Sequence, residues 1–149
     1  MTWSDQIADR LTLREVSDRY ARAVDRRDAD AIADIFTEDA ELSIHEPAEA
    51  EPPSRVLRGR SEISGIPRLI ARYPKTFHFM GNALYEIDDD SATGEVYCVA
   101  HHLTHDPAGA TDYVMLIRYL DAYQRCDDGR WRISSRRLLV DWTEDRATG

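Results

Sequence analysis

An aspartate and a histidine far apart in the sequence are the first candidates for chemistry. Asp25 lies near the end of a helical pattern, where the helix dipole disfavours a negative charge, so a carboxylate there needs a compensating partner. His78 lies between Phe77 and Phe79 in a segment rich in aromatic residues. A carboxylate that is hydrogen-bonded to an imidazole fixes the ring tautomer and makes the other nitrogen a stronger base. Such a pair could abstract a proton next to an electron-withdrawing group.

Both residues also have a purely structural interpretation, as a solvated helical aspartate and a hydrogen-bonded core histidine. His101, His102 and His105 could suggest a metal site, but a strand turns His102 away from the other two, so we expect no metal. The sequence contains no glycine-rich phosphate loop, no GxSxG elbow and no cysteine nucleophile with a nearby base. Nucleotide and covalent chemistry are therefore disfavoured, and we expect no cofactor.

Composition limits the class of protein. With 149 residues, 42% of them hydrophobic, the chain 1–149 fits one compact domain with room for an enclosed pocket. A formal net charge of −9 disfavours nucleic acid and anionic membranes as partners. The sequence has no apolar run of membrane-spanning length and no signal-peptide pattern, so we expect a cytoplasmic protein. Cys98 and Cys126 show no CxxC spacing, which argues against a disulfide framework or a zinc site.

Three helices are expected in the first half of the chain. Residues 4–27 contain no Gly or Pro and carry apolar residues at helical spacing. Asp28 is a suitable N-cap for a second helix over residues 29–36. A third helical pattern covers residues 60–73, with irregular first turns at residues 65–67 because of Gly and Pro.

The other segments favour strands. We expect a turn at residues 37–40, a short strand over 41–44, and an exposed, acidic, Pro-rich loop over 45–55 that could act as a lid. Four β-branched and aromatic runs then follow, with turn sequences between them that predict antiparallel pairing. These runs are residues 76–87, 93–105, 112–125 and 130–142. Helices followed by a meander of strands predict an α+β fold.

Alternation along the strands predicts which side chains face a pocket. In residues 93–105, the set that contains Cys98, Ala100 and His102 is small and apolar until its last member, so we expect it to face inward. This places His102 inside and His101 outside, although one β-bulge would exchange them. Periodicity alone leaves the inner face of the last strand open.

Several motifs together carry a resemblance to a known family. They are Tyr20-x4-Asp25, Gly59-x3-Ile63, HFMGN from His78, SATGEVYCVAHH from Ser91, and the closing RYLDAYQRCDDGRWRISSRR. The chain resembles the SnoaL-like, nuclear-transport-factor-like superfamily, near scytalone dehydratase, bile-acid dehydratase and hexachlorocyclohexane dehydrochlorinase. The resemblance implies a cone-shaped barrel, in which a curved, mostly antiparallel mixed sheet packs against three N-terminal helices.

The resemblance also implies site residues. The catalytic dyad of the family falls on Asp25 and His78, and a tyrosine that binds substrate oxygen falls on Tyr20. A second pocket histidine matches His102, and a pocket arginine of the dehydrochlorinase type matches Arg136. Tyr20 could instead be a core residue, and Arg136 could belong to a solvated strand edge.

Cys98 and Met115 complete the predicted substrate-binding residues. The chain departs from the bile-acid type, because Ala100 stands where that type has an acid and Val140 stands where it has an arginine. These two departures argue against a bile-acid substrate.

The expected function is that of a cofactor-independent lyase, a dehydratase or related eliminase, which acts on a small hydrophobic cyclic or polyketide-like substrate. An isomerase or cyclase would use the same dyad, and a non-catalytic ligand-binding or assembly module would keep only the fold. The resemblance also implies that the outer face of the sheet is buried against another subunit. The outward residues Tyr97 and Val99 are apolar enough for that role, so we expect a homodimer or homotrimer.

Overall fold

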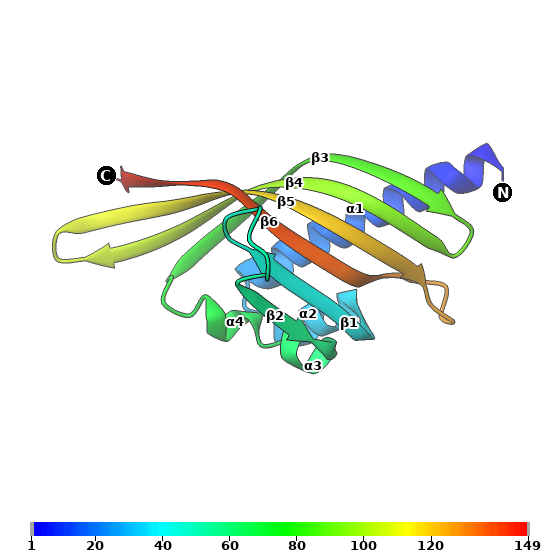
Figure 1. The fold of residues 1–149 in the computed structure, drawn as a ribbon, viewed down its shortest axis with the longest axis horizontal. Coiled ribbons are helices and arrows are strands. Elements are labelled where there is room, and N and C mark those ends of the chain that lie inside the picture. Colours follow the sequence, from blue (N-terminus) through cyan, green and yellow to red (C-terminus); the bar gives the residue numbers. More distant parts are fainter. Residues whose placement is uncertain (1, 149) are drawn as a thin grey trace.

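A computed structural model describes residues 2–148 and shows an α+β fold, as the sequence predicts. One mixed sheet of six strands has the order β2-β1-β6-β5-β4-β3, and helices lie against one of its faces (Figure 1). The helices are α1 (Trp3–Asp25), α2 (Ala29–Ile35), α3 (Gly59–Ile63) and α4 (Ile66–Leu69). The strands are β1 (Phe36–His45), β2 (Arg55–Arg58), β3 (Lys75–Asp88), β4 (Ser91–Asp106), β5 (Gly109–Arg125) and β6 (Trp131–Thr148).

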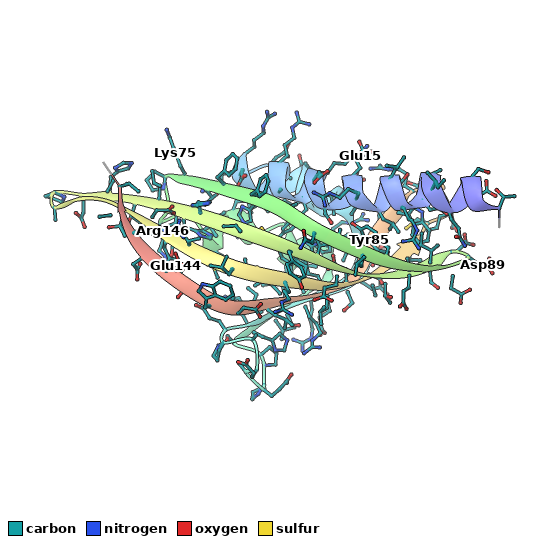
Figure 2. The ribbon with its side chains drawn as sticks, turned by 90° about the horizontal axis from the view of Figure 1, so that it is seen from above. Glu15, Lys75, Tyr85, Asp89, Glu144 and Arg146 are labelled. Carbon is teal, nitrogen blue, oxygen red and sulfur yellow. The ribbon has the colours of Figure 1, made fainter. Side chains whose placement is uncertain are left out.

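The sheet is strongly curved but not closed. Strands β3 to β6 form the predicted antiparallel meander, and β1 joins it by parallel pairing with β6. Strands β2 and β3 remain as the two edges, so the cone is open rather than a complete barrel. Figure 2 shows α1 running alongside β3, where Arg10 and Arg14 donate hydrogen bonds to backbone carbonyls of this edge strand. These bonds satisfy backbone carbonyl groups that an uncovered edge strand would leave without a protein partner.

Arg27 helps to fix the end of α1 to the start of β3. Arg27 has a positive φ of 59°, which turns the chain away from the helix so that Asp28 can cap α2. The Arg27 guanidinium donates hydrogen bonds to the carbonyl oxygens of Val24 and Tyr73 and to Oγ1 of Thr76. Because these contacts join both elements, they hold the last residues of α1 beside the first residues of β3.

Three predictions for the segment between α2 and β3 were wrong. Residues 37–40 belong to β1 and not to a turn. The pairing of β1 with β6 shifts register between Phe36 and Glu41, so these residues lack the regular alternation by which a strand is recognised in a sequence. His45 is buried at the end of β1 rather than part of an exposed loop, because Ser43 and the carbonyl of Ala50 bond both of its ring nitrogens. The third helix is two short helices, since the chain breaks at residues 64–65.

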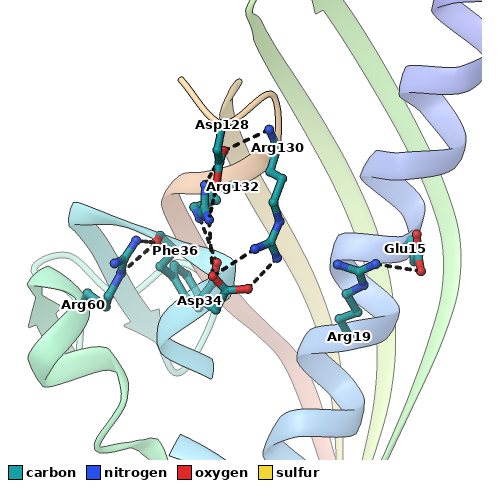
Figure 3. A network of polar contacts seen from close by, with 8 residues as sticks. All are labelled: Glu15, Arg19, Asp34, Phe36, Arg60, Asp128, Arg130 and Arg132. Carbon is teal, nitrogen blue, oxygen red and sulfur yellow. Dashed lines mark hydrogen bonds and ion pairs between the residues drawn. The ribbon is translucent and has the colours of Figure 1, made fainter. Parts of the chain in front are cut away.

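A network of ion pairs holds α2 against the β5–β6 turn (Figure 3). Asp34 accepts hydrogen bonds from Arg130 and Arg132, and Arg132 also binds Asp128 in the turn. Arg60 of α3 donates to the carbonyl of Phe36 at the start of β1. These contacts fix α2 to the β5–β6 turn and α3 to the start of β1. Among residues 2–148, no helix is long and apolar enough to cross a membrane.

Candidate functional site

Asp25 and His78 meet in a tight hydrogen-bonded pair. The Nδ1 atom of His78 donates to Oδ1 of Asp25 over 2.7 Å, and the backbone N–H of His78 donates to Oδ2 over 3.0 Å. Thr76 adds a third bond, from its hydroxyl to Oδ1 over 2.9 Å. Burial alone would raise the pKa of Asp25, but the bonds from His78 and Thr76 outweigh it, so that the pKa lies below the ordinary 3.8. The carboxylate is therefore ionised at neutral pH.

The alternation of β3 explains why this pair forms. Thr76 and His78 are two residues apart and share the face toward α1, whereas Phe77 and Phe79 point to the opposite face and are exposed. The Arg27 contacts bring the end of α1 to the same level, so Asp25 meets both inward side chains. With Nδ1 occupied by the carboxylate, the Nε2 atom of His78 is the nitrogen left for a ligand.

His78 lines a cavity of about 410 Å³ between the helices and the inner face of the sheet. Its wall is mainly apolar toward the sheet and carries tyrosines and a second histidine near His78. The lining residues are Tyr20, Val24, Leu42, Ile44, Glu46, Ser54, Arg55, Ile66, Leu69, Ile70, Arg72, Tyr73, His78, His102, Tyr113, Met115, Ile117, Tyr119 and Leu138. Asp25 is not among the lining residues, so it can act on a ligand only through its hydrogen bond to His78.

The structure places His102 inside the cone and His101 on the outer face. His102 is 4% exposed, and its ring centre lies 5.8 Å from that of His78. Its Nδ1 is 3.1 Å from the carbonyl oxygen of Tyr113, which can only accept, so Nδ1 carries the proton and Nε2 is an acceptor. Burial lowers the pKa of His102 and keeps the ring neutral. His101 instead pairs with Asp112 over 2.6 Å.

Two of the predicted substrate-binding residues lie behind the cavity wall. The Arg136 side chain is 0% exposed and forms two hydrogen bonds with Asp121, of 2.8 and 2.7 Å. Its guanidinium carbon lies 4.3 Å from the ring centre of Tyr20 and 4.0 Å from that of Tyr119, and both of these rings do line the cavity. Arg136 is therefore held by Asp121 behind the rings of Tyr20 and Tyr119, outside the residues that line the cavity.

Cys98 is likewise outside the cavity lining, because it packs between the two neighbouring strands opposite Met80 and Ile117. Burial raises the pKa of its thiol to about 12, so the group remains protonated. Met115 and Tyr20 do line the cavity. Their contact with a substrate stays a prediction.

Sequence reasoning missed a tyrosine wall beside His102. The ring centre of Tyr73 lies 4.9 Å from that of His102, and Tyr73 stacks on Tyr113 with an interplanar angle of 8°. The Tyr113 hydroxyl donates to Glu46 over 2.9 Å, which connects the segment after β1 to the sheet. Tyr113 is paired directly with His102 across β4 and β5, so the turn between these strands could have revealed it.

Similarity to known proteins adds to this geometry. The sequence model of the SnoaL-like domain matches residues 5–137. The chain belongs to the SnoaL-like family. An uncharacterised protein of Mycobacterium tuberculosis is 28% identical to this SnoaL-like chain over 133 residues, which cover 88% of the chain and 84% of that protein.

Solved structures share the SnoaL-like fold at lower identity. A proposed scytalone dehydratase of Novosphingobium aromaticivorans superposes with a TM-score of 0.81 at 19% identity, covering 99% of this chain and 94% of that one. A hexachlorocyclohexane dehydrochlorinase, LinA-type3 of Novosphingobium barchaimii, gives a TM-score of 0.80 at 19% identity, covering 99% and 97%. At this level of identity the similarity shows the fold alone.

Proposed function

We propose that this SnoaL-like protein is a cofactor-independent lyase, a dehydratase or related eliminase that acts on a small hydrophobic substrate. The observation that carries the proposal is the Asp25–His78 hydrogen bond of 2.7 Å, with His78 on the wall of an apolar cavity. The dehydratase and dehydrochlorinase among the proteins of similar fold support the same reaction class.

In the proposed reaction, Nε2 of His78 takes a proton from a carbon next to a carbonyl or ring system. The electron pair of that C–H bond forms the new double bond, and the leaving group departs from the neighbouring carbon. A halide leaves as the anion, whereas a hydroxide receives the proton from the His78 imidazolium and leaves as water. The ionised Asp25 stabilises the imidazolium between these steps.

Tyr20 and His102 have different parts in this scheme. Burial raises the pKa of Tyr20, so its hydroxyl stays protonated and can donate a hydrogen bond to a substrate oxygen. The neutral His102 can accept a hydrogen bond from a substrate hydroxyl through Nε2. The two groups would orient an oxygenated ring, because one offers a donor and the other an acceptor.

The proposal is tested by product analysis. We would incubate the protein with a panel of hydroxylated and halogenated rings that carry a carbonyl beside the reactive carbon, and follow each compound by mass spectrometry. Loss of water or of hydrogen halide is expected for at least one ring. A product of unchanged mass but altered double-bond position would show that the same dyad serves an isomerase.

A ligand-binding module is the second candidate, and the relation between binding and turnover separates it from an enzyme. If rings bind in the cavity but none of them is converted, and if binding is unaffected by replacing Asp25, the lyase proposal is wrong.

We also propose that a second copy of the chain covers the outer face of the sheet. Phe77 and Phe79 of β3 are each 62% exposed, and Leu84, Tyr97 and Trp142 extend the same apolar surface across the neighbouring strands. Patches of this kind are typical of subunit contacts. Light scattering should give the mass of a dimer or trimer, and the double variant Phe77→Glu and Phe79→Glu should be a monomer. A monomeric wild type would contradict this proposal.

A further inference from the structure

Two arginines without a carboxylate partner lie on the wall of the cavity. Arg55 begins β2 and Arg72 follows α4, and both side chains are exposed to solvent as well as lining the cavity. Within 4.0 Å, neither guanidinium meets a carboxylate of the described residues, whereas more than half of the arginines of the chain do. The chain has 28 acidic residues against 19 basic ones, so carboxylates are in excess over basic groups.

The position of Arg72 is fixed by an aromatic side chain. Its guanidinium carbon lies 4.8 Å above the centre of the Tyr73 ring, and its Nη2 donates to the Tyr73 hydroxyl over 2.8 Å. Tyr73 in turn packs against His102 inside the cavity. The positive charge of Arg72 is therefore held close to the tyrosine wall.

Among residues 2–148, the carboxylates near this part of the cavity form no ion pair with Arg55 or Arg72 within 4.0 Å. Glu46 lines the same cavity, but its Oε1 accepts the hydrogen bond of the Tyr113 hydroxyl, and no ion pair joins it to Arg55 or Arg72 within 4.0 Å in residues 2–148. Asp145 shares an adjoining open hollow with Arg72, also without such an ion pair. The solvent-facing part of the cavity thus presents two available guanidinium groups, while its interior presents Leu42, Ile117 and other apolar side chains.

We propose that Arg55 and Arg72 bind an acidic group of the ligand, so that the substrate is a hydrophobic ring compound bearing a carboxylate. This inference rests on the proposed function for the role of the cavity as substrate site, and it narrows the substrate class. Guanidinium groups suit carboxylates because their N–H donors match the two oxygens. An acidic group held near solvent avoids the cost of burying a charge, while the ring reaches His78.

The test compares two ligands that differ only in charge. Affinities for 2-naphthylacetate and 2-naphthylacetamide would be measured by isothermal titration calorimetry. The wild type should bind the carboxylate about fivefold to tenfold more tightly than the amide, the scale of one or two partly exposed ion pairs. The double variant Arg55→Gln and Arg72→Gln should lose this preference and keep its affinity for the amide. Added salt should reduce the preference in the wild type.

Arg22 provides a matched control. It is an exposed arginine without a carboxylate partner within 4.0 Å among the residues that the structure describes, and it lines a separate hollow beside α1. Arg22→Gln should therefore leave both affinities unchanged. Equal wild-type affinities for the two ligands, no binding of the carboxylate at millimolar concentration, or an equal effect of Arg22→Gln would overturn the proposal.

A catalytically impaired variant separates this inference from the proposed function. His78→Gln should retain the preference for the carboxylate, since His78 is not one of the two arginines that carry it. If the preference is intact but no ring is ever converted, the lyase proposal fails while the acidic-ligand site stands.

Discussion

Replacing His78 with Gln should lower the turnover number for elimination by about 10²- to 10⁴-fold, the usual contribution of a general base. Asp25→Asn should fall in the same range, because an amide cannot stabilise the imidazolium and can present its N–H₂ group to Nδ1, which disrupts the tautomer. The double variant should be little worse than either single variant, since the two side chains act as one unit. Steady-state kinetics on the ring identified by product analysis would measure all three.

The outer face of the sheet offers a matched control for the dyad. His101 and Asp112 form a hydrogen bond of 2.6 Å, nearly the same as that between His78 and Asp25, but His101 does not line the cavity. His101→Gln should therefore leave turnover unchanged. Full activity in His78→Gln, or an equal loss in His101→Gln, would show that the Asp25–His78 pair is structural.

The parts of the fold that the sequence predicts are those with a long local pattern. The helix α1 carries one period throughout, and β3 to β6 are long enough that their type and order could be assigned in spite of register shifts in the pairing of β3 with β4 and of β5 with β6. Residues 37–40 could not, because Glu38 and Asp39 interrupt the alternation where the pairing of β1 shifts register. Strand β2 follows a Pro-rich segment and has only four residues, too few for a period to appear.

The site shows the same division between local and non-local information. The side of the sheet on which His102 lies follows from alternation along one strand. Whether the Arg136 guanidinium is free or paired depends instead on which residue of the neighbouring strand lies beside it. Asp121 and Arg136 are equally far along the chain from the turn at Asp128 and Gly129, and the structure pairs them directly. Counting outward from the pair of Arg125 and Trp131 beside this turn would place Ser135 opposite Asp121, because the register shifts between Ala122 and Tyr123. The ion pair therefore depends on an irregularity of the pairing, and the free state of Arg55 and Arg72 depends on the positions of many distant carboxylates.

Removal of the Asp121 charge should strongly destabilise the folded protein. The Asp121–Arg136 pair is completely buried, and Asp121 also accepts a hydrogen bond from Tyr123 over 2.8 Å. Burial alone would lower the pKa of Arg136, but Asp121 outweighs this effect and raises it, so the guanidinium keeps its charge. Asp121→Asn leaves that charge uncompensated in the core, and its free energy of unfolding should fall by about 3–5 kcal/mol. Urea unfolding at pH 7 measures the loss.

Two further variants decide whether charge is the cause. The double variant Asp121→Leu and Arg136→Met keeps an apolar volume and buries no charge, so it should be more stable than Asp121→Asn. Glu15→Gln breaks the exposed pair with Arg19 on α1 (Figure 3) and should change the free energy of unfolding very little. A double variant less stable than Asp121→Asn would mean that packing dominates over charge.

Because Arg136 lies behind Tyr20, its loss should reduce activity through the stability and shape of the cavity wall, whereas loss of Arg55 or Arg72 should reduce ligand affinity alone.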